Sequence, residues 1–496
     1  MSAIPPYLTH LAAGMNSDLL ILPDLYESLM LRGESWSSWA FGGALFLVPD
    51  IAVHLPIATV MGDGVRAYLL QTALWAVLLW AGFILLGLAR AGRHATRGMG
   101  WVLVFFILAT HTGVWPQFAE FWQVLYHPMV HGGGYLLIVG SMLLVFAYLR
   151  KGRPWMLGLL ALACISGTVS DLLYCVYFTL PCLFSLAVLA LLHPNRRRRV
   201  PAPVTVIILS TVLARILLPW LIPSSHAEIL YVNRTGPGTA WNTALFMARD
   251  LFEHKRWLFL ASSLVSFAAA TCLAIRLLWN YRNRPLISWR ACYLDLSTIT
   301  ALAGGWAAIL ATGNYVDGGS WRYLIFPSTL VLVMVVWNAA PAIPRWAGIL
   351  GVVVSLGLGS IHGYSLPNLE RPYPAMARFL DSLGRDTKPL VLGDYWTARR
   401  TTFLCRGGIR VEQICSDGKI YHWVNSLESY ERIQQSPAPS TLVIMDRLDP
   451  AQIRAAYGEP TEQHRVDGSL VFVYAPPKST GIAQFITENL RQLRSR

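Results

Sequence analysis

The sequence predicts a polytopic α-helical membrane protein with about ten spans, followed by a soluble α/β domain. Of the 496 residues, 54% are hydrophobic and only 14% are charged, against roughly 25% in soluble domains. The mean hydropathy is +0.46. Apolar runs such as 66–90 and 257–279 are long enough to cross a bilayer core of about 30 Å. Residues 370–496 instead alternate short apolar runs with polar stretches.

The transmembrane domain is predicted over residues 66–365. Its expected spans are 66–90, 99–119, 132–149, 155–169, 173–193, 202–222, 257–279, 292–312, 321–340 and 346–364. The connecting segments ARAGRHATRG, LRKGRP, PNRRRRV, NYRNRPLISWR and PAIPR are basic, and all five fall on one side, which predicts that side as cytoplasmic. The net charge of +13 is therefore a topology signal, and we expect no nucleic-acid partner.

Residues 1–65 are predicted to be an external acidic loop region, because an even number of spans places both ends of the transmembrane domain outside. Two explanations for the missing first anchor stay open. Either a first helix precedes the sequence given, or 39–62 is itself a span. The second alternative puts Asp50 and His54 near the middle of the bilayer, which costs several kcal/mol for an unpaired acid. We therefore favour the first.

The C-terminal residues predict a small α/β domain, since strand and helix patterns alternate. Strands are expected at 388–394, 409–414, 441–446 and 469–475, and helices at 375–385 and 449–458. Cys405 and Cys415 lie in this domain and could pair in an oxidising compartment. The other five cysteines fall in or beside apolar spans, where small buried apolar side chains are the default interpretation.

The candidate catalytic residues are acids in NSDLLILPDLYESLMLRGESWSSWAFGGALFLVPD, which contains Asp18, Asp24, Glu27, Glu34 and Asp50. The default interpretation of each acid is a solvated surface group. Asp18 differs because the apolar run 19–22 follows it, and partial desolvation is expected to raise its basicity toward the working pH. Asp18 is thus the predicted base, with Asp24 and Asp50 as supporting acids.

Several polar groups near the outer ends of spans are candidates for substrate binding. Arg215 lies inside span 202–222 and Arg322 begins span 321–340, so both could meet a lipid phosphate or could simply anchor at the interface. Asp171 is either a helix N-cap or a further acid of the site. A second group, made of His111, His127, His131 and Glu120, could line a polar cavity. A divalent cation there stays open, although the spacing matches no standard metal motif and we assign no metal ligand.

These motifs resemble the GT-C superfamily of integral membrane glycosyltransferases, and within it glycosyltransferase family 39 and uncharacterised bacterial relatives. NSDLLILPDLY with Asp18 resembles the acid of the first external loop, and FLVPD with Asp50 resembles an aromatic-proline-acid motif later in that loop. GNYVDGGSWRYLIFP, with Arg322 and Tyr323, resembles a late Arg-Tyr segment, and GDYWTARRTTFL resembles a motif of the periplasmic domain. The expected first helix is missing.

The resemblance implies a multi-pass protein of the bacterial inner membrane with a periplasmic C-terminal domain. It implies inverting transfer of a hexose or pentose from a polyprenyl-phosphate donor to a glycan, lipid or protein acceptor. Arg322, Arg215, Tyr323, Asp171 and His111 are then the candidates for binding substrate and lipid phosphate. The alternative function is a non-catalytic membrane protein or a transporter for lipid-linked saccharides, which usually shows paired halves that this sequence lacks.

Overall fold

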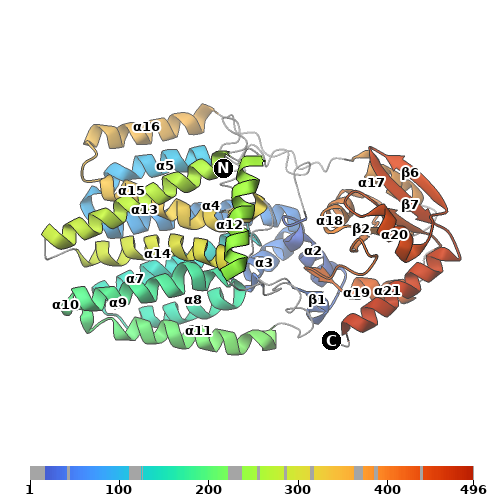
Figure 1. Ribbon diagram of the computed structural model, residues 1–496, viewed down its shortest axis with the longest axis horizontal. Coiled ribbons are helices and arrows are strands. Elements are labelled where there is room, and N and C mark those ends of the chain that lie inside the picture. The colour runs from blue at the N-terminus through green and yellow to red at the C-terminus, as the bar shows by residue number, and fades with distance from the viewer. Residues whose placement is uncertain are drawn as a thin grey trace.

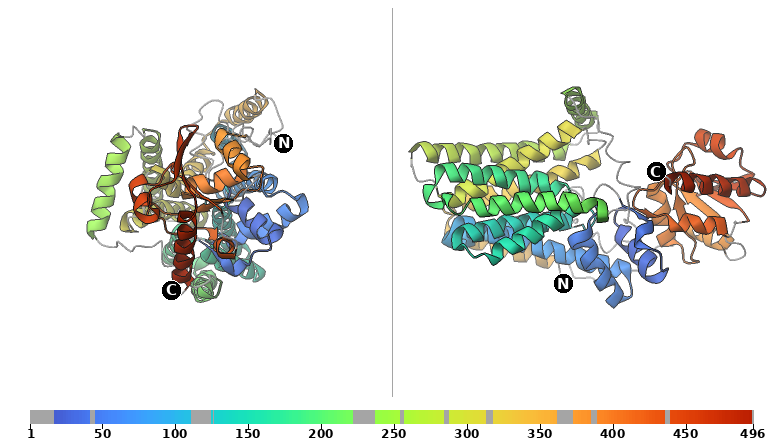
Figure 2. Two further views of the ribbon diagram at one scale, coloured as in Figure 1. Left: turned by 90° about the vertical axis from the view of Figure 1, so that its right-hand side faces the viewer. Right: turned by 90° about the horizontal axis from the view of Figure 1, so that it is seen from below.

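The computed structural model describes residues 17–41, 45–110, 125, 127–221, 237–253, 257–283, 288–312, 318–361, 373–384, 389–435 and 439–494. Long helices form an elongated bundle, and the C-terminal α/β domain stands beyond one end of it (Figure 1). The first elements of the chain lie between these two bodies, as Figure 2 also shows from below. They are α2 (Ile21–Tyr26), η2 (Glu27–Leu31), η3 (Trp36–Ser38), β1 (Trp39–Ala40), η4 (Leu47–Ile51) and α3 (Ala52–Met61).

Each predicted span overlaps a described helix, although positions 111–119, 222 and 362–364 of the predicted spans lie outside the described residues. These helices are α4 (Gly64–Ala91), α5 (Ala95–Thr110), α7 (Gly132–Lys151), α8 (Trp155–Ser170), η6 (Cys175–Thr179) continuing into α9 (Leu180–Leu192), α11 (Pro201–Leu221), α13 (Trp257–Asn283), α14 (Trp289–Thr312), α15 (Arg322–Ala339) and α16 (Arg345–Ile361). Shorter helical pieces are η5 (Gly92–His94), α10 (Pro194–Arg197) and η7 (Gly318–Trp321), and α12 (Pro237–Glu253) precedes α13.

Within the described residues, seven helices are long and apolar enough to cross a membrane, which makes the chain a multi-pass membrane protein by length and composition. Of the other predicted spans, α8 has 16 residues, which at 1.5 Å per residue extend about 24 Å, less than the roughly 30 Å of a bilayer core. The described parts of α5 and α16 have 16 and 17 residues, and the residues that follow each of them lie outside the description. The count of ten spans therefore stays a prediction. The helix Leu47–Met61, inside the alternative span 39–62, is shorter still.

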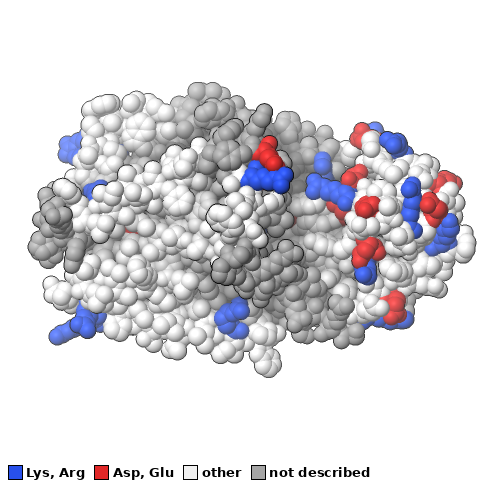
Figure 3. Space-filling model, viewed as in Figure 1, with Lys and Arg blue, Asp and Glu red and all other residues white. Residues whose placement is uncertain are grey.

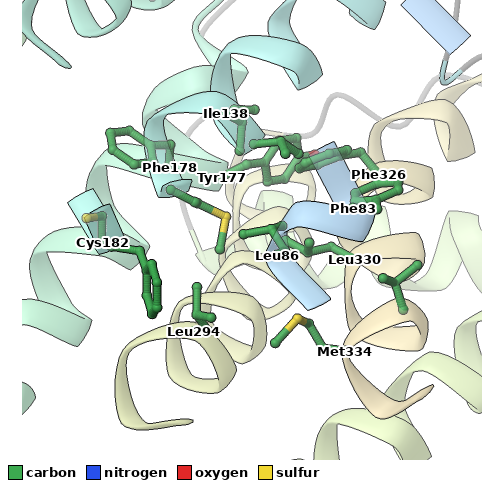
Figure 4. Close-up of a cluster of buried hydrophobic side chains, with 14 of the residues drawn as sticks. Phe83, Leu86, Ile138, Tyr177, Phe178, Cys182, Leu294, Phe326, Leu330 and Met334 are labelled. Carbon is green, nitrogen blue, oxygen red and sulfur yellow. The ribbon is translucent and has the colours of Figure 1, made fainter. Parts of the chain in front are cut away.

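The bundle is apolar both inside and outside. Phe83 and Leu86 of α4 lie against Phe326, Leu330 and Met334 of α15, in a cluster that also takes in α7, α9 and α14 (Figure 4). Apart from Arg215, the outer surface of α11 is apolar too, with Trp220 84% exposed. A helix that is hydrophobic on all sides fits contact with lipid. Figure 3 shows the difference between the two bodies: charged side chains gather over the C-terminal domain and are sparse over the bundle.

The C-terminal domain contains a five-stranded sheet in the order β3-β2-β5-β7-β6. Its strands are β2 (Leu390–Gly393), β3 (Val411–Gln413), β5 (Thr441–Ile444), β6 (Glu462–Val466) and β7 (Ser469–Tyr474). β2 pairs in parallel with both β3 and β5, whereas β7 is antiparallel to β5 and β6. The β6–β7 turn is Asp467-Gly468, and both residues have positive φ, as a two-residue hairpin turn requires.

The helices of this domain are α17 (Ala375–Gly384), α18 (Tyr395–Leu404), α19 (Glu428–Gln435), α20 (Pro450–Tyr457) and α21 (Lys478–Arg494). The predicted strands are confirmed as β2, β3, β5 and β7, and the predicted helices as α17 and α20. Asp449 caps α20 through the N–H of Ala451, and Gly458 ends that helix. Cys405 and Cys415 are free thiols.

Candidate functional site

Asp18 connects the helical bundle to the C-terminal domain. The hydroxyl of Tyr395, the first residue of α18, donates to its Oδ1 at 2.5 Å. Its Oδ2 lies 3.5 Å from a terminal nitrogen of Arg322, the first residue of α15. The carboxylate therefore sits where the amino-terminal segment, a bundle helix and the soluble domain meet, and 20% of its side chain stays exposed.

Arg322 is only partly satisfied by its neighbours. Its guanidinium donates to the Tyr323 hydroxyl at 3.3 Å and lies 5.2 Å from the centre of that ring. Its Nε–H is buried and has no acceptor among the described residues. Because a buried donor without a partner costs free energy, this guanidinium is suited to a further acceptor, and an anionic oxygen is the strongest kind.

The position of Tyr323 follows from the proline in RYLIFP. Pro327 lies inside α15 and has no N–H, so it cannot bond the carbonyl of Tyr323, four residues earlier. The hydroxyl of Tyr177 donates to that carbonyl instead. Tyr323 is thereby held with its ring edge-on to His131, at 5.5 Å between ring centres. The sequence predicted both Arg322 and Tyr323 as site candidates, and the structure brings them together with Asp18.

A second acidic group lies at the N-terminus of α7. Asp171 Oδ2 lies 2.5 Å from His131 Nδ1, and Asp171 Oδ1 accepts the N–H of Leu173 at 2.9 Å. One oxygen of Asp171 thus caps a helical turn, as one of the two alternatives from the sequence expected, and the other contacts His131, while a role for Asp171 in the site stays a prediction. His131 itself has a φ of 74°, a left-handed conformation that costs a non-glycine residue on the order of 1 kcal/mol.

Asp50 is buried beside the same helix end, with 1% of its surface exposed. The indole N–H of Trp75 donates to Oδ1 at 2.6 Å and the backbone N–H of Met129 to Oδ2 at 3.3 Å. Burial raises the pKa of Asp50 to about 7, and the nearby Asp171 adds to the rise. Asp50 is therefore a carboxyl group that can exchange a proton near neutral pH.

The glycines of HGGG allow both acids to approach α7. A Cβ at Gly133 would lie 2.3 Å from Asp50 Oδ1, and one at Gly134 would lie 3.1 Å from Asp171 Oδ2. No other residue fits at Gly133 without displacing the carboxylate. The N-terminal end of α7 therefore lies directly beside both carboxyl groups.

Asp24 is held differently from Asp18. Its two oxygens pair with Arg32 at 3.2 Å and with Arg399 of α18 at 3.1 Å. Burial alone would raise the pKa of Asp24, but the guanidinium groups of Arg410, Arg399 and Arg32 outweigh it and hold the pKa below its ordinary value. Its predicted role as a supporting acid stays a prediction, and its visible contacts join two parts of the chain.

The same polar interface continues around Glu34. Its Oε1 pairs with Arg32 and Arg432, both at 2.9 Å, and Arg410 lies 3.5 Å away. Burial pushes its pKa up, but the Ser28 hydroxyl and these cations prevail and lower it. Trp39 and Ala40 of β1 pair with Ser426 and Asn425 of β4 (Asn425–Ser426). The amino-terminal segment is thus an integral part of the soluble domain's surface.

Three of the predicted residues lie apart from this site or outside the described residues. Arg215 is exposed on α11, and no acid in the described part of the chain pairs with it. His111 and Glu120 fall outside the described residues. His127 is buried and its Nδ1 lies 2.9 Å from the Tyr68 hydroxyl. No group of three or more His, Cys, Asp or Glu among the described residues could hold a metal ion.

Arg399 and Arg410 pair with Asp24 and Glu34, and the sequence did not point to either of these arginines. One signal was available for Arg399, because Tyr395 and Arg399 are four residues apart in YWTARR and so share a helix face. No such local signal marks Arg410. We found no match to this chain among protein-family models, curated proteins or solved structures.

Proposed function

We propose that this protein is a glycosyltransferase of the GT-C type in the bacterial inner membrane. It moves a sugar from a polyprenyl-phosphate donor to an acceptor hydroxyl on the periplasmic face, with inversion. The observation that carries the proposal is the pair formed by Asp18 and Arg322, 3.5 Å apart at the end of the bundle. A carboxylate beside a guanidinium with a spare donor provides the two opposite charges that this reaction requires.

In the proposed reaction, Asp18 accepts the proton of the acceptor hydroxyl. The acceptor oxygen forms a bond to the anomeric carbon as the bond from that carbon to the phosphate oxygen breaks. The phosphate monoester leaves with the bonding electrons, and Arg322 stabilises its charge. Attack from the face opposite to the leaving group inverts the anomeric centre, and the transition state resembles that of glycoside hydrolysis.

The contact between Asp18 and Arg322 suggests how the donor activates the base. At 3.5 Å the contact is long for a charge-assisted hydrogen bond, which is usually below 3 Å. A phosphate that binds Arg322 competes for the same guanidinium and frees Asp18 Oδ2 to accept a proton. The bond from Tyr395 to Oδ1 keeps the carboxylate oriented during this exchange.

The position of Arg322 supports a lipid-linked donor. It is the first residue of α15, at the end of the bundle that the basic loops predict as external. The phosphate of a polyprenyl lipid lies at that depth, where the membrane meets water. His131, Asp171 and Tyr323 then form a polar wall beside the phosphate site. We expect no metal ligand to be needed for this arrangement, and we assign none.

The test is turnover of full-length protein in lipid nanodiscs with radiolabelled polyprenyl-phosphate hexose and pentose donors. We expect Asp18→Asn to lower the release of polyprenyl phosphate by a factor of about 10² to 10⁴, the usual contribution of a general base. Glu27→Gln is the matched control, because it removes one negative charge from the same segment at a side chain that is 40% exposed. Equal turnover by Asp18→Asn and wild type would eliminate the assignment of the base.

A further inference from the structure

The soluble domain has a pocket of its own, at the carboxyl ends of its parallel strands. The pocket has a volume of about 320 Å³, within the range of small-molecule sites. It is lined by residues that follow β2, β3 and β5, namely Asp394, Tyr395, Trp396, Ile414, Cys415, Ser416, Tyr421, Arg447 and Leu448. Its lining combines aromatic, polar and aliphatic side chains.

The topology of the sheet explains why a pocket forms there. β2 lies in the middle of the parallel part, with β3 on one side and β5 on the other. The chain leaves β2 through α18 toward β3, and it leaves β5 through α20 toward β6, which lies on the opposite side of the sheet. The segments after β2 and β5 therefore diverge and leave a crevice between them. Ligands in open α/β sheets bind preferentially at such a point.

Asp394 carries the strongest sign of a ligand. It is 7% exposed, and its Oδ1 caps α18 by accepting the N–H groups of Trp396 at 2.8 Å and Thr397 at 3.4 Å. Its Oδ2 is buried and receives no hydrogen bond from the described residues. A buried carboxylate oxygen without a donor is costly, and a hydroxyl of a bound ligand would satisfy it.

The remaining wall offers complementary groups. The guanidinium of Arg447 lies 5.5 Å from the ring centre of Trp396, which is 38% exposed. Tyr421 meets Tyr395 edge-on, with 5.7 Å between the ring centres. The pocket thus combines aromatic surface with a buried acceptor and a cationic donor. A ligand that has an apolar face and several hydroxyl groups matches this set, and a pyranose ring is such a ligand.

We propose that this pocket binds a saccharide unit of the glycosyl acceptor. One sugar hydroxyl donates to Asp394 Oδ2, another oxygen accepts from Arg447, and the C–H face of the ring lies against the aromatic side chains. The assignment to the acceptor rests on the proposed function. Its structural basis is Tyr395, because this residue lines the pocket while its hydroxyl donates to Asp18. One side chain therefore connects the sugar pocket to the proposed base.

The test measures binding directly, so that it does not depend on turnover. Full-length protein in nanodiscs is titrated with a panel of methyl pyranosides and disaccharides, and binding is followed by saturation-transfer difference NMR. We expect a signal from at least one member and a loss of affinity of about tenfold or more in both Asp394→Asn and Arg447→Gln. Asn at position 394 preserves the cap of α18, because Asn caps as well as Asp.

Asp449→Asn is the matched control, since Asp449 also caps a helix of this domain but does not line the pocket. Its affinity should equal that of wild type. Absence of any saccharide signal from wild type, or equal affinity in all four proteins, overturns the proposal. Binding without any donor turnover would instead leave the pocket in place and refute only the glycosyltransferase assignment.

Discussion

The amino-terminal segment, residues 17–40, contacts both the C-terminal domain and the end of the bundle. Cations outnumber acids at the first contact, whereas acids outnumber cations at the second. Toward the soluble domain, Asp24 and Glu34 face Arg399, Arg410 and Arg432, with Arg32 of the same segment between them. Asp24 and Glu34 each have at least two cationic partners. Buried acids of this kind are held in place by their neighbours, and they serve structure.

At the end of the bundle, acids outnumber the cations that face them. Asp18, Asp50 and Asp171 lie around Arg322 and His131 in the part of the chain that the structure describes. The contact between Arg322 and Asp18 is long, at 3.5 Å. Burial raises the pKa of Asp50 to about 7. Acids with several cationic partners thus lie at the interface with the C-terminal domain, whereas acids with fewer cationic partners lie where the proposed reaction would take place.

The largest effect on the docking interface is expected from Arg399→Met. This change removes the more deeply buried of the two cations paired with Asp24, and it also removes the bonds from Arg399 to the carbonyls of Ser17 and Val424. We expect a loss of about 3–5 kcal/mol in the free energy of unfolding, the usual result of breaking a buried ion pair on one side. Thermal unfolding in detergent measures it. Arg465→Met, at an exposed position of β6, is the control and should change little.

The next effect concerns Asp50→Asn and depends on pH. Because the pKa of Asp50 is raised from 3.8 to about 7, the folded protein retains a proton that the unfolded chain releases between these values. Its contribution to stability is present below pH 3.8 and is lost as pH rises through about 7. Asn cannot titrate, so the variant should gain on wild type across this window, by up to about 4 kcal/mol.

Thermal midpoints of both proteins between pH 4.5 and 8 measure this difference. About half of the gain in stability of Asp50→Asn over wild type is expected near pH 5.5. Asp467→Asn, in the exposed β6–β7 turn, controls for the loss of one negative charge. A gap between Asp50→Asn and wild type that does not change with pH would contradict the argument that Asp50 is protonated by its burial.

The smallest effect is expected from Arg432→Gln. Arg432 pairs with Glu34 at 2.9 Å, but its side chain is 48% exposed, and Glu34 keeps Arg32 and Arg410. An exposed partner in such a network contributes less than about 1 kcal/mol. Thermal unfolding of Arg432→Gln is measured beside that of Arg399→Met. Equal losses of unfolding free energy in the two variants would show that the burial of a cation does not determine how much its ion pair contributes.

Local patterns predicted the bundle helices and the buried strands well, because long apolar runs and short apolar runs each have one plausible structure. β6 was missed because its residues EQHRV are mostly exposed and show no apolar alternation. α21 and α19 were not singled out. The pairing of β1 with β4 has no local signal at all, since each strand has two residues and they lie far apart in the sequence.

The candidate site was predictable as a set of residues but not as a geometry. Asp18, Arg322, Tyr323, Asp50 and Asp171 each carry a signal in the sequence, because acids and cations beside apolar spans are unusual. Their grouping depends on which helix ends meet, and on Pro327 and Gly133 in particular. The docking of α18 onto Asp18 and Asp24 depends on tertiary contacts, which no local pattern reveals.

The ion pair between Asp24 and Arg399 has a consequence for biosynthesis. The two residues are 375 positions apart. At roughly 5–20 residues per second, a ribosome makes Arg399 about 20–75 s after Asp24. The acidic segment must therefore stay hydrated while all the intervening helices are inserted. The contacts of this segment are completed only when the C-terminal domain, residues 370–496, has been made.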